Sequence, residues 1–249
     1  LKNNEFNLIN FYKRRAKRIL PVLFFIIIVC LPLSWFLFSP IQMENFSESI
    51  LSIIFFSSNF LFWKKTNYFN NLTENEILLH TWSLSVEEQF YLFFPIFIII
   101  LWKLSKNRIF KIILFISICS LLISEIGWRF TPVANFYLAP TRAWEILSGS
   151  LVALALENRR YKANNFLSLS GFILIIFSFI FFDEKWPFPS IYTLLPVIGV
   201  SLIIIYSNKS TILYKILSLR SLVFIGLISY SAYLWHLPVL SFFIIITNN

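Results

Sequence analysis

The stretch from His80 to Tyr91 combines a histidine, two acids and several hydroxyls directly before an apolar run. On a helix, Ser83, Glu87 and Tyr91 recur every four residues and therefore share one face. His80 lies one turn before Ser83 on the side of Glu87, and a carboxylate beside an imidazole raises its basicity and fixes its tautomer. This spacing suits a general base. It is equally typical of a helix that begins at the membrane interface, with acids in its first turn.

Arg142 and Glu145 form a second polar group, one helical turn apart and just after Pro140. Their opposite charges could pair, which lowers the cost of bringing either side chain into the membrane. The alternative is a helix start at the interface, with Trp144 in the aromatic belt. The spacing leaves both interpretations open.

A third polar group lies inside the last apolar run, between Ser229 and Pro238. Tyr233 and His236 are three residues apart and project from the same side of a helix. A single His in an apolar helix is usually a structural residue. With Tyr230 and Tyr233 nearby, the lining of a polar pocket is a comparable interpretation.

The fourth group is basic and runs from Lys13 to Arg18, directly before an apolar segment. Arg15 and Arg18 are three residues apart on one face, and guanidinium groups bind phosphates through paired hydrogen bonds. With Arg14 and Lys17 they could hold a cosubstrate that carries phosphates. Juxtamembrane Lys and Arg are also expected from topology and anionic lipid alone.

The composition indicates what kind of protein carries these groups. Of 249 residues, 58% are hydrophobic and 13% are charged, about half the charged share of soluble domains. Thirty Phe and eight Trp leave too little polar surface to cover a soluble globule. The net charge of +9 comes from Lys and Arg placed between apolar runs, which indicates cytoplasmic loops rather than nucleic-acid binding. Cys30 and Cys119 lie inside apolar runs, so we expect neither a disulfide nor a metal site.

Apolar segments can be traced at 19–38, 46–63, 84–102, 109–126, 142–156, 166–182, 189–206 and 221–247. A membrane-spanning helix needs about 20 apolar residues, and continuous runs of this length differ from the alternating strands of a barrel. We therefore expect an all-α polytopic transmembrane helical bundle with about seven or eight apolar helices. A single membrane-embedded domain is expected over residues 1–249.

Loop charge bears on the topology of these segments. Basic residues cluster at 13–18 and 103–111, so both clusters should face the cytoplasm. Loops on one side are joined by an even number of crossings, whereas three apolar segments lie between these two clusters. The weakest is 46–63, which contains Glu48, Asn59 and several serines. Either it is re-entrant or interfacial, or the charge rule fails here.

Taken in order, the four polar groups resemble the motifs of acyltransferase family 3, a family of integral membrane acyltransferases. The family pattern Arg-x-x-Arg-Ile-x-Pro is matched from Arg15 to Pro21, and Ser-x-Glu-x-x-Phe-Tyr from Ser85 to Tyr91. Arg-x-x-Glu followed by Gly is matched at Arg142–Gly149, and Ser-Tyr-Ser-x-Tyr-Leu-x-His at Ser229–His236. Each match is weak alone, but four in sequence over most of the chain are specific.

The resemblance implies transfer of an acyl group, usually acetyl, from cytosolic acyl-CoA to a hydroxyl of an envelope glycan such as lipopolysaccharide or exopolysaccharide. It implies a multi-pass protein of the inner (cytoplasmic) membrane whose partners are the lipid bilayer, the glycan acceptor and acyl-CoA, with no nucleic acid. Acyl-CoA would be a cosubstrate, and we expect no permanently bound cofactor and no metal. This chemistry needs a base for the hydroxyl and donors for the oxyanion.

The resemblance and the spacing together give the candidate site residues. The catalytic candidates are His80, Glu87, Arg142, Glu145 and His236. The candidates for binding the CoA phosphates are Arg14, Arg15, Lys17 and Arg18. The candidates for lining the substrate pocket are Trp82, Ser85, Tyr91, Tyr230 and Tyr233.

The family has two helices before its basic motif, and the first carries a His regarded as the catalytic base. Few residues precede Tyr12 here, so we expect a fragment that is truncated at both ends. It would lack those helices, the last helix of the family and any appended soluble hydrolase-like domain, and its own activity would be impaired. His80 is the alternative base that this sequence offers. Two other functions fit intramembrane Glu, Arg and His: a glycan or lipid transporter or flippase, and a non-catalytic partner in a glycan-assembly complex.

Overall fold

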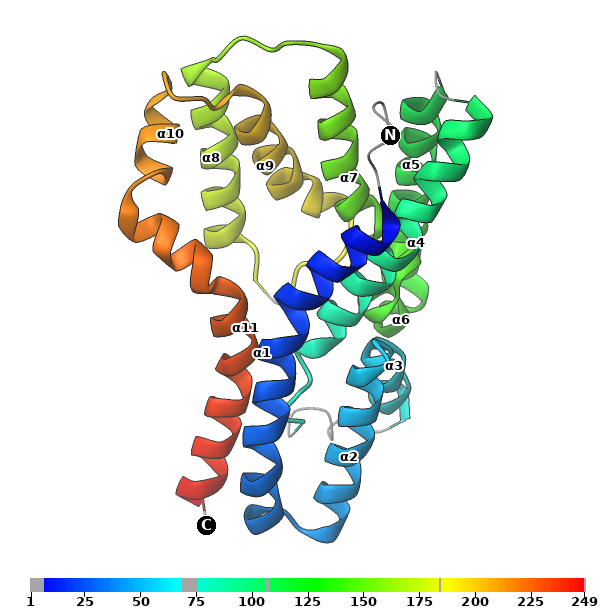
Figure 1. The fold of residues 1–249 in the computed structure, drawn as a ribbon, viewed down its shortest axis with the longest axis vertical. Coiled ribbons are helices and arrows are strands. Elements are labelled where there is room, and N and C mark those ends of the chain that lie inside the picture. Colours follow the sequence, from blue (N-terminus) through cyan, green and yellow to red (C-terminus); the bar gives the residue numbers. More distant parts are fainter. Residues whose placement is uncertain (1–6, 69–75, 106–107, 184, 249) are drawn as a thin grey trace. The chain divides into compact units, whose positions relative to one another are not determined.

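The computed structural model describes residues 7–68, 76–105, 108–183 and 185–248 (Figure 1). Every regular element in these ranges is a helix, which confirms the expected all-α class. The chain divides into two compact units, one of Leu1–Ile100 with Gly226–Asn249 and the other of Leu101–Ile225. The single domain expected over residues 1–249 stays a prediction.

Helices suited to a membrane account for most of the apolar segments. In the described part of the chain, four are long and apolar enough to cross a bilayer: Leu8–Leu37, Thr81–Leu104, Ile109–Phe130 and Arg220–Thr247. Shorter apolar helices cover Asn165–Phe181 and Ile191–Tyr206. These helices coincide with the segments expected from the sequence, and together they support a multi-pass membrane protein.

The first unit contains α1 (Leu8–Leu37), α2 (Pro40–Ile54), α3 (Ser58–Tyr68), most of α4 (Thr81–Ser105) and most of α11 (Arg220–Asn248). The side chain of Asn7 caps α1 by accepting hydrogen bonds from the backbone of Ile9 and Asn10. Because α1 begins at Leu8, the whole basic cluster of residues 13–18 is helical.

The direction of the helices in this unit follows from their contacts. α11 runs parallel to α1, since Tyr230 bonds to Ile19 while Phe242 stacks on Phe38. α4 runs antiparallel to α1, since the Tyr12 hydroxyl donates to the carbonyl of Leu92 (2.8 Å) and Arg15 pairs with Glu88. Between them lies an apolar core drawn from α1, α2, α4, α11 and the turn before α4: Ile19, Leu23, Ile26, Ile27, Cys30, Phe46, Ile53, Ile77, Leu78, Leu84, Leu234 and Phe242.

The segment expected at 46–63 is two helices with a break between them. Phe56, in the break, has a φ of 49°, a left-handed conformation that a bulky residue adopts only under tertiary constraint. At 1.5 Å per residue α2 is about 22 Å long, short of the roughly 30 Å of a hydrocarbon core. This agrees with a re-entrant or interfacial segment, and α1 and α4 then provide an even number of crossings.

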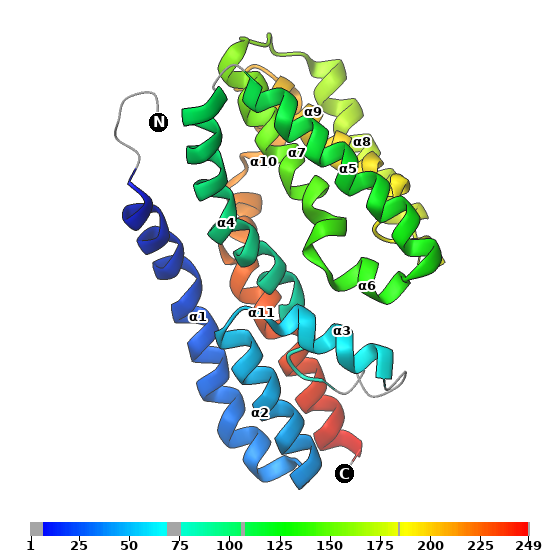
Figure 2. The same ribbon diagram turned by 90° about the vertical axis from the view of Figure 1, so that its right-hand side faces the viewer.

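The second unit contains α5 (Ile109–Phe130), α6 (Pro132–Tyr137), α7 (Ala139–Asn158), α8 (Asn165–Phe181), the 3-10 turn η3 (Ile191–Thr193), α9 (Leu194–Tyr206) and α10 (Ile212–Leu217). α5 packs along α7, and α8 along α9 (Figure 2). Two glycines allow α8 and α9 to approach closely. A Cβ on Gly171 would lie 2.6 Å from the carbonyl oxygen of Gly199, and a Cβ on Gly199 would lie at the same distance from the carbonyl oxygen of Gly171.

Candidate active site

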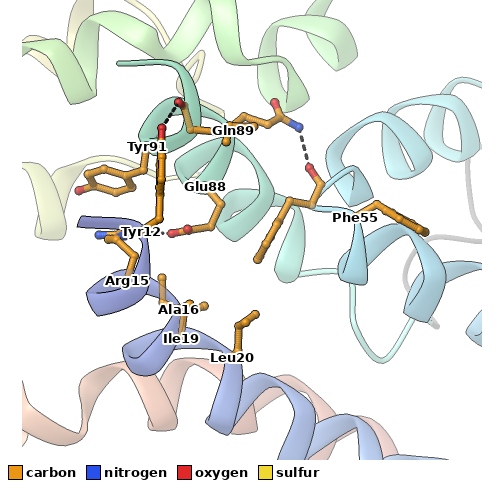
Figure 3. A pocket seen from close by; sticks show the side chains of 11 residues that line it. Tyr12, Arg15, Ala16, Ile19, Leu20, Phe55, Glu88, Gln89 and Tyr91 are labelled. Carbon is orange, nitrogen blue, oxygen red and sulfur yellow. Dashed lines mark hydrogen bonds and ion pairs between the residues drawn. The ribbon is translucent and has the colours of Figure 1, made fainter. Parts of the chain in front are cut away.

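Arg15 is the centre of a charged cluster in the first unit. Its guanidinium lies between two consecutive acids of α4, with Nη2 3.1 Å from Glu87 Oε1 and in ion-pair contact with Glu88 Oε1. Its Cζ also lies 3.4 Å from the centre of the Tyr91 ring. Arg15 and Glu88 face each other in Figure 3. This arginine is therefore held by the protein itself, through charge and through stacking.

The other cations of the basic cluster remain exposed around it. Arg14, Lys17 and Arg18 project from α1 into solvent, whereas Arg15 is partly buried. The sequence predicted that Arg15 and Arg18 would act together on phosphate. The structure separates their environments, because the charge of Arg15 is balanced by two carboxylates and that of Arg18 is exposed.

A pocket of about 310 Å³ opens beside the arginine cluster. Its polar wall consists of Tyr12, Arg15, Glu88, Gln89 and Tyr91, and its apolar wall of Ala16, Ile19, Leu20, Phe55, Phe56 and Leu92 (Figure 3). The Gln89 amide donates to the carbonyl of Phe56 (2.8 Å) and to Asn59 Oδ1 (2.9 Å), so it joins α4 to the break between α2 and α3. A pocket with apolar walls and a few oriented polar groups is the usual form of a small-molecule site.

His80 lies in the turn directly before α4, in a second polar cluster. Its ring centre is 5.0 Å from that of His236 and 5.2 Å from that of Tyr233, both on α11. The Tyr233 hydroxyl donates to the carbonyl of His80 (2.5 Å) and accepts from Ser83 Oγ at the same distance. The two histidines, predicted separately from the sequence, are thus brought together by the fold.

The imidazole of His80 has an unusual environment. The residue is only 8% exposed, and neither ring nitrogen has a hydrogen-bond partner within the described part of the chain. Burial, with a smaller contribution from the neighbouring His236, lowers the pKa of His80 to about 4, while the Leu234 backbone opposes this shift. At neutral pH the ring is therefore uncharged, with a nitrogen lone pair available to accept a proton.

The expected pairing of His80 with Glu87 does not form. Glu87 bonds to Arg15, and the ring of His80 faces Tyr233 and His236. The helical face was correctly predicted for Glu87 and Tyr91, which both contact Arg15. The partner on that face is an arginine of α1, 72 residues away, which no helical spacing could indicate.

The remaining pocket candidates of the first unit have separate roles. Tyr230 donates to the carbonyl of Ile19 (3.1 Å) and so joins α11 to α1. Ser85 is buried, and its hydroxyl forms a hydrogen bond with Ser58 Oγ (2.7 Å) that connects α4 to α3. Trp82 is partly buried in the first turn of α4.

The predicted pair of Arg142 and Glu145 is present in the second unit. Arg142 Nη2 lies 3.3 Å from Glu145 Oε2, and its Nη1 donates to the carbonyl of Phe136 (3.3 Å). The guanidinium also lies over the ring of Phe188, 4.7 Å from its centre. The second oxygen of Glu145, Oε1, is buried and accepts no hydrogen bond from the described residues. Trp144, expected in an aromatic belt, is instead buried, and its backbone N–H donates to Ser120 Oγ.

Several residues of these clusters were not among the sequence candidates. Glu88 and Gln89 stand inside the motif that singled out Glu87, and Tyr12 opens the basic cluster, so proximity was the available signal. Phe56 carried no signal, because its role depends on a backbone conformation that arises only in the folded chain.

The chain is similar to known proteins along nearly its whole length. The profile of the family described as "Acyltransferase domain" matches residues 2–249. The chain is 32% identical to the peptidoglycan O-acetyltransferase OatA of Listeria monocytogenes, over 96% of this chain and 41% of that protein. It is 29% identical to the O-acetyltransferase OatA of Staphylococcus aureus, over 97% and 42%. A putative O-acetyltransferase of Staphylococcus aureus strain COL is 34% identical, over 94% and 41%. The chain thus spans about two fifths of the length of these relatives. No solved structure matches the chain.

Proposed function

The chain belongs to acyltransferase family 3, the family described as "Acyltransferase domain", and we propose that it transfers an acetyl group from acetyl-CoA to a hydroxyl of a cell-envelope glycan. The observation that carries this proposal is the neutral imidazole of His80, buried without a hydrogen-bond partner among the described residues beside Tyr233 and His236 of α11. Peptidoglycan, on which the Listeria relative acts by its name, is the proposed acceptor in place of lipopolysaccharide.

The arrangement along α4 supports acetyl-CoA as the donor. Glu88, which pairs with Arg15, is eight residues beyond His80, and eight residues correspond to about 12 Å of helix. In acetyl-CoA an extended arm joins the phosphates to the thioester, and such a donor could reach from the arginine cluster to His80. In this proposal Arg14, Lys17 and Arg18 contact the phosphates, because their charges are exposed, while Arg15 is held in the wall of the pocket.

The pocket beside Arg15 suits the arm of such a donor. Its apolar wall, which includes Leu20 and Leu92, would bury methylene groups, and the oxygen of the Gln89 amide could accept from an amide N–H. With the arm there, the reactive end would lie toward the start of α4. The positive charge would stay at the end of α1 that carries the basic cluster, which we place on the cytoplasmic side of the inner membrane.

The chemistry assigned to His80 is general base catalysis. A ring nitrogen accepts the proton of the glycan hydroxyl as its oxygen forms a bond to the thioester carbon. The carbon–sulfur bond then breaks, and the departing CoA thiolate takes the proton from the imidazolium. Tyr233 holds the backbone of His80 during this step through its hydrogen bond to the carbonyl, and Ser83 donates to the Tyr233 hydroxyl. Burial keeps His80 uncharged before the reaction, and the neighbouring His236 adds to this effect.

We also propose that Arg142 and Glu145 form a sugar-binding site within the second unit. Glu145 Oε1 is a buried acceptor without a partner in the described part of the chain, and a sugar hydroxyl is a donor of suitable chemistry. Arg142 holds the other carboxylate oxygen and so fixes the orientation of the acid. In Glu145→Gln, an NH₂ group replaces one carboxylate oxygen, so a hydrogen-bond donor stands where an acceptor was. This change should raise the KM for the glycan.

The test is acetyl transfer by the protein reconstituted in liposomes with radiolabelled acetyl-CoA and peptidoglycan fragments. We expect His80→Gln to lower kcat by about 10²–10⁴-fold with little change in the KM for acetyl-CoA. The triple change of Arg14, Lys17 and Arg18 to Gln should raise that KM at least about tenfold, as each lost charge-assisted bond is worth a tenfold or more. Lys111→Gln, which removes an exposed cation of α5, is the matched control.

Three results would contradict the proposal. Absence of label transfer by the unchanged protein would reject the activity. Full activity of His80→Gln would reject the assignment of the base. Uptake or flipping of the glycan that depends on a proton gradient and not on acetyl-CoA would favour a transporter.

A further inference from the structure

An ion-pair network lies at the end of α3, apart from the groups used above. Lys65 Nζ lies 2.8 Å from Glu76 Oε1, 3.1 Å from Asn45 Oδ1 and 3.4 Å from Glu48 Oε2. The hydroxyl of Ser49 donates to the other oxygen of Glu76 (3.0 Å). Glu76 is buried and Lys65 nearly so, whereas Glu48 is half exposed. The network joins α2, α3 and the short segment that leads into α4.

The cost of burying these charges indicates a specific role. Taking an ammonium and a carboxylate out of water is expensive, and a buried pair seldom stabilises a fold more than apolar residues of the same size would. Ionisable side chains in the apolar part of a membrane protein are functional candidates for this reason. What matters is therefore which part of the molecule the pair holds in place.

That part is the turn carrying His80. The carbonyl of Glu76 accepts from Leu79, and the carbonyl of Leu78 accepts from the backbone and side chain of Thr81. The turn between them is anchored by the ion pair at one end and by the Tyr233 hydroxyl on the His80 carbonyl at the other. The imidazole has no hydrogen bond of its own within the described residues, so its position is set by these backbone anchors together with the ring contacts to Tyr233 and His236.

We propose that Lys65 and Glu76 are positioning residues, which hold the Ile77–His80 turn so that the imidazole of His80 meets its substrate. The catalytic part of this inference rests on the proposed function, since it takes His80 as the base. The positional part stands on the contacts alone and can be measured without any substrate.

The experiment uses the fact that the chain has only two histidines. In protein labelled with ¹³C at histidine, two ring resonances are expected, and His236→Gln identifies the one from His80. We expect Lys65→Met and Glu76→Gln to shift the His80 resonance and to increase its modification by diethyl pyrocarbonate at least tenfold. Lys65→Arg, which keeps the charge, should restore both readings to near the unchanged protein.

Two controls separate positioning from general loss of stability. Lys64→Met removes an exposed neighbour on α3 and should leave His80 unchanged. Glu125→Gln removes an ion pair of the second unit, where Glu125 bonds to Arg129 (2.7 Å) and to the backbone of Ile191 (2.9 Å). It should lower the unfolding temperature without shifting the His80 resonance. In acetyl transfer, Lys65→Met should lower kcat about tenfold or more at constant KM for acetyl-CoA.

The outcomes distinguish this inference from the proposed function. If Lys65→Met and Glu76→Gln leave the His80 resonance and its modification rate within twofold of the unchanged protein, the positioning role is rejected. A shifted resonance with unchanged kcat would keep the positioning and reject His80 as the base. A shift produced equally by Glu125→Gln would overturn the inference, because general destabilisation would then explain it.

Discussion

At the scale of single residues, the two carboxylates that hold Arg15 differ in burial. The side chains of Glu88 and Arg15 are 12% and 18% exposed, whereas that of Glu87 is 49% exposed. Removing a buried carboxylate leaves the charge of its arginine partner without compensation, whereas water can take the place of an exposed carboxylate. Glu88 therefore carries most of the structural role, although the sequence motif singles out Glu87.

This difference gives a first prediction. Glu88→Gln should destabilise the protein by about 3 kcal/mol, because the guanidinium of Arg15 loses its buried partner. Glu87→Gln should cost less than about 1 kcal/mol. Unfolding in detergent, followed by circular dichroism against denaturant, compares the two variants. Equal losses in the two variants would show that burial does not separate the roles of these acids.

The histidine cluster gives a prediction on pH. The pKa of His80 is about 4 in the folded protein and 6.5 ordinarily, so between these values the unfolded chain binds a proton that the folded chain does not. Stability should be level above about pH 6.5 and should fall by up to about 3 kcal/mol as the pH drops toward 4. Besides His80, the groups facing this site are His236 and Tyr233. The unfolding temperature between pH 7.5 and 4.5 is the measurement, and His80→Gln should flatten this part of the curve.

At the scale of elements, the pairing of α8 with α9 depends on two glycines. Without a hydrophobic force between helices in lipid, close packing through small residues holds them together. A methyl group on Gly171 would meet the Gly199 carbonyl at 2.6 Å, a distance that forces the backbones apart. The same change at Gly149 meets no atom within 4 Å.

Alanine substitution at these glycines tests the packing. Gly171→Ala should destabilise the protein by about 1–3 kcal/mol through overpacking. Gly149→Ala, in the middle of α7, should be neutral or stabilise by up to about 1 kcal/mol, because alanine favours a helix. Thermal unfolding of both variants in the same detergent gives the comparison. A tolerated Gly171→Ala would mean that the two helices can separate at little cost.

The break between α2 and α3 is the other informative element. The sequence marked 46–63 as the weakest span because of its polar residues, and two of these, Asn59 and Glu48, have specific partners in the structure. Asn59 accepts from Gln89 beside the pocket, and Glu48 joins the network of Lys65. The polar residues that make 46–63 a poor membrane span therefore connect α2 and α3 to each other and to α4.

At the scale of the whole molecule, the helices predict a topology. With α1 and α4 crossing and the α2–α3 segment not crossing, Lys13 and Lys103 should face the same side of the membrane, and Ile41 the other. Single cysteines at these positions, in a background with Cys30 and Cys119 changed to Ala, can be labelled with an impermeant maleimide from each side. Opposite labelling of Lys13→Cys and Lys103→Cys would show that α2–α3 crosses as well.

The sequence by itself determined what depends on composition and on local spacing. The all-α membrane class follows from apolar runs that exceed a strand in length, and the one-turn spacing of Arg142 and Glu145 made possible the ion pair that the structure contains. The family also follows from the chain, because motifs in a fixed order are a property of sequence.

Only the tertiary structure decided which of these groups meet. His80 and His236 are 156 positions apart and lie on different helices, yet their rings are neighbours, while His80 and Glu87, seven positions apart, have different partners. The physical reason is that helical periodicity fixes only the face of a residue. What that face contacts is set by the packing of α1, α4 and α11 around one apolar core, and by buried charges that must find partners there.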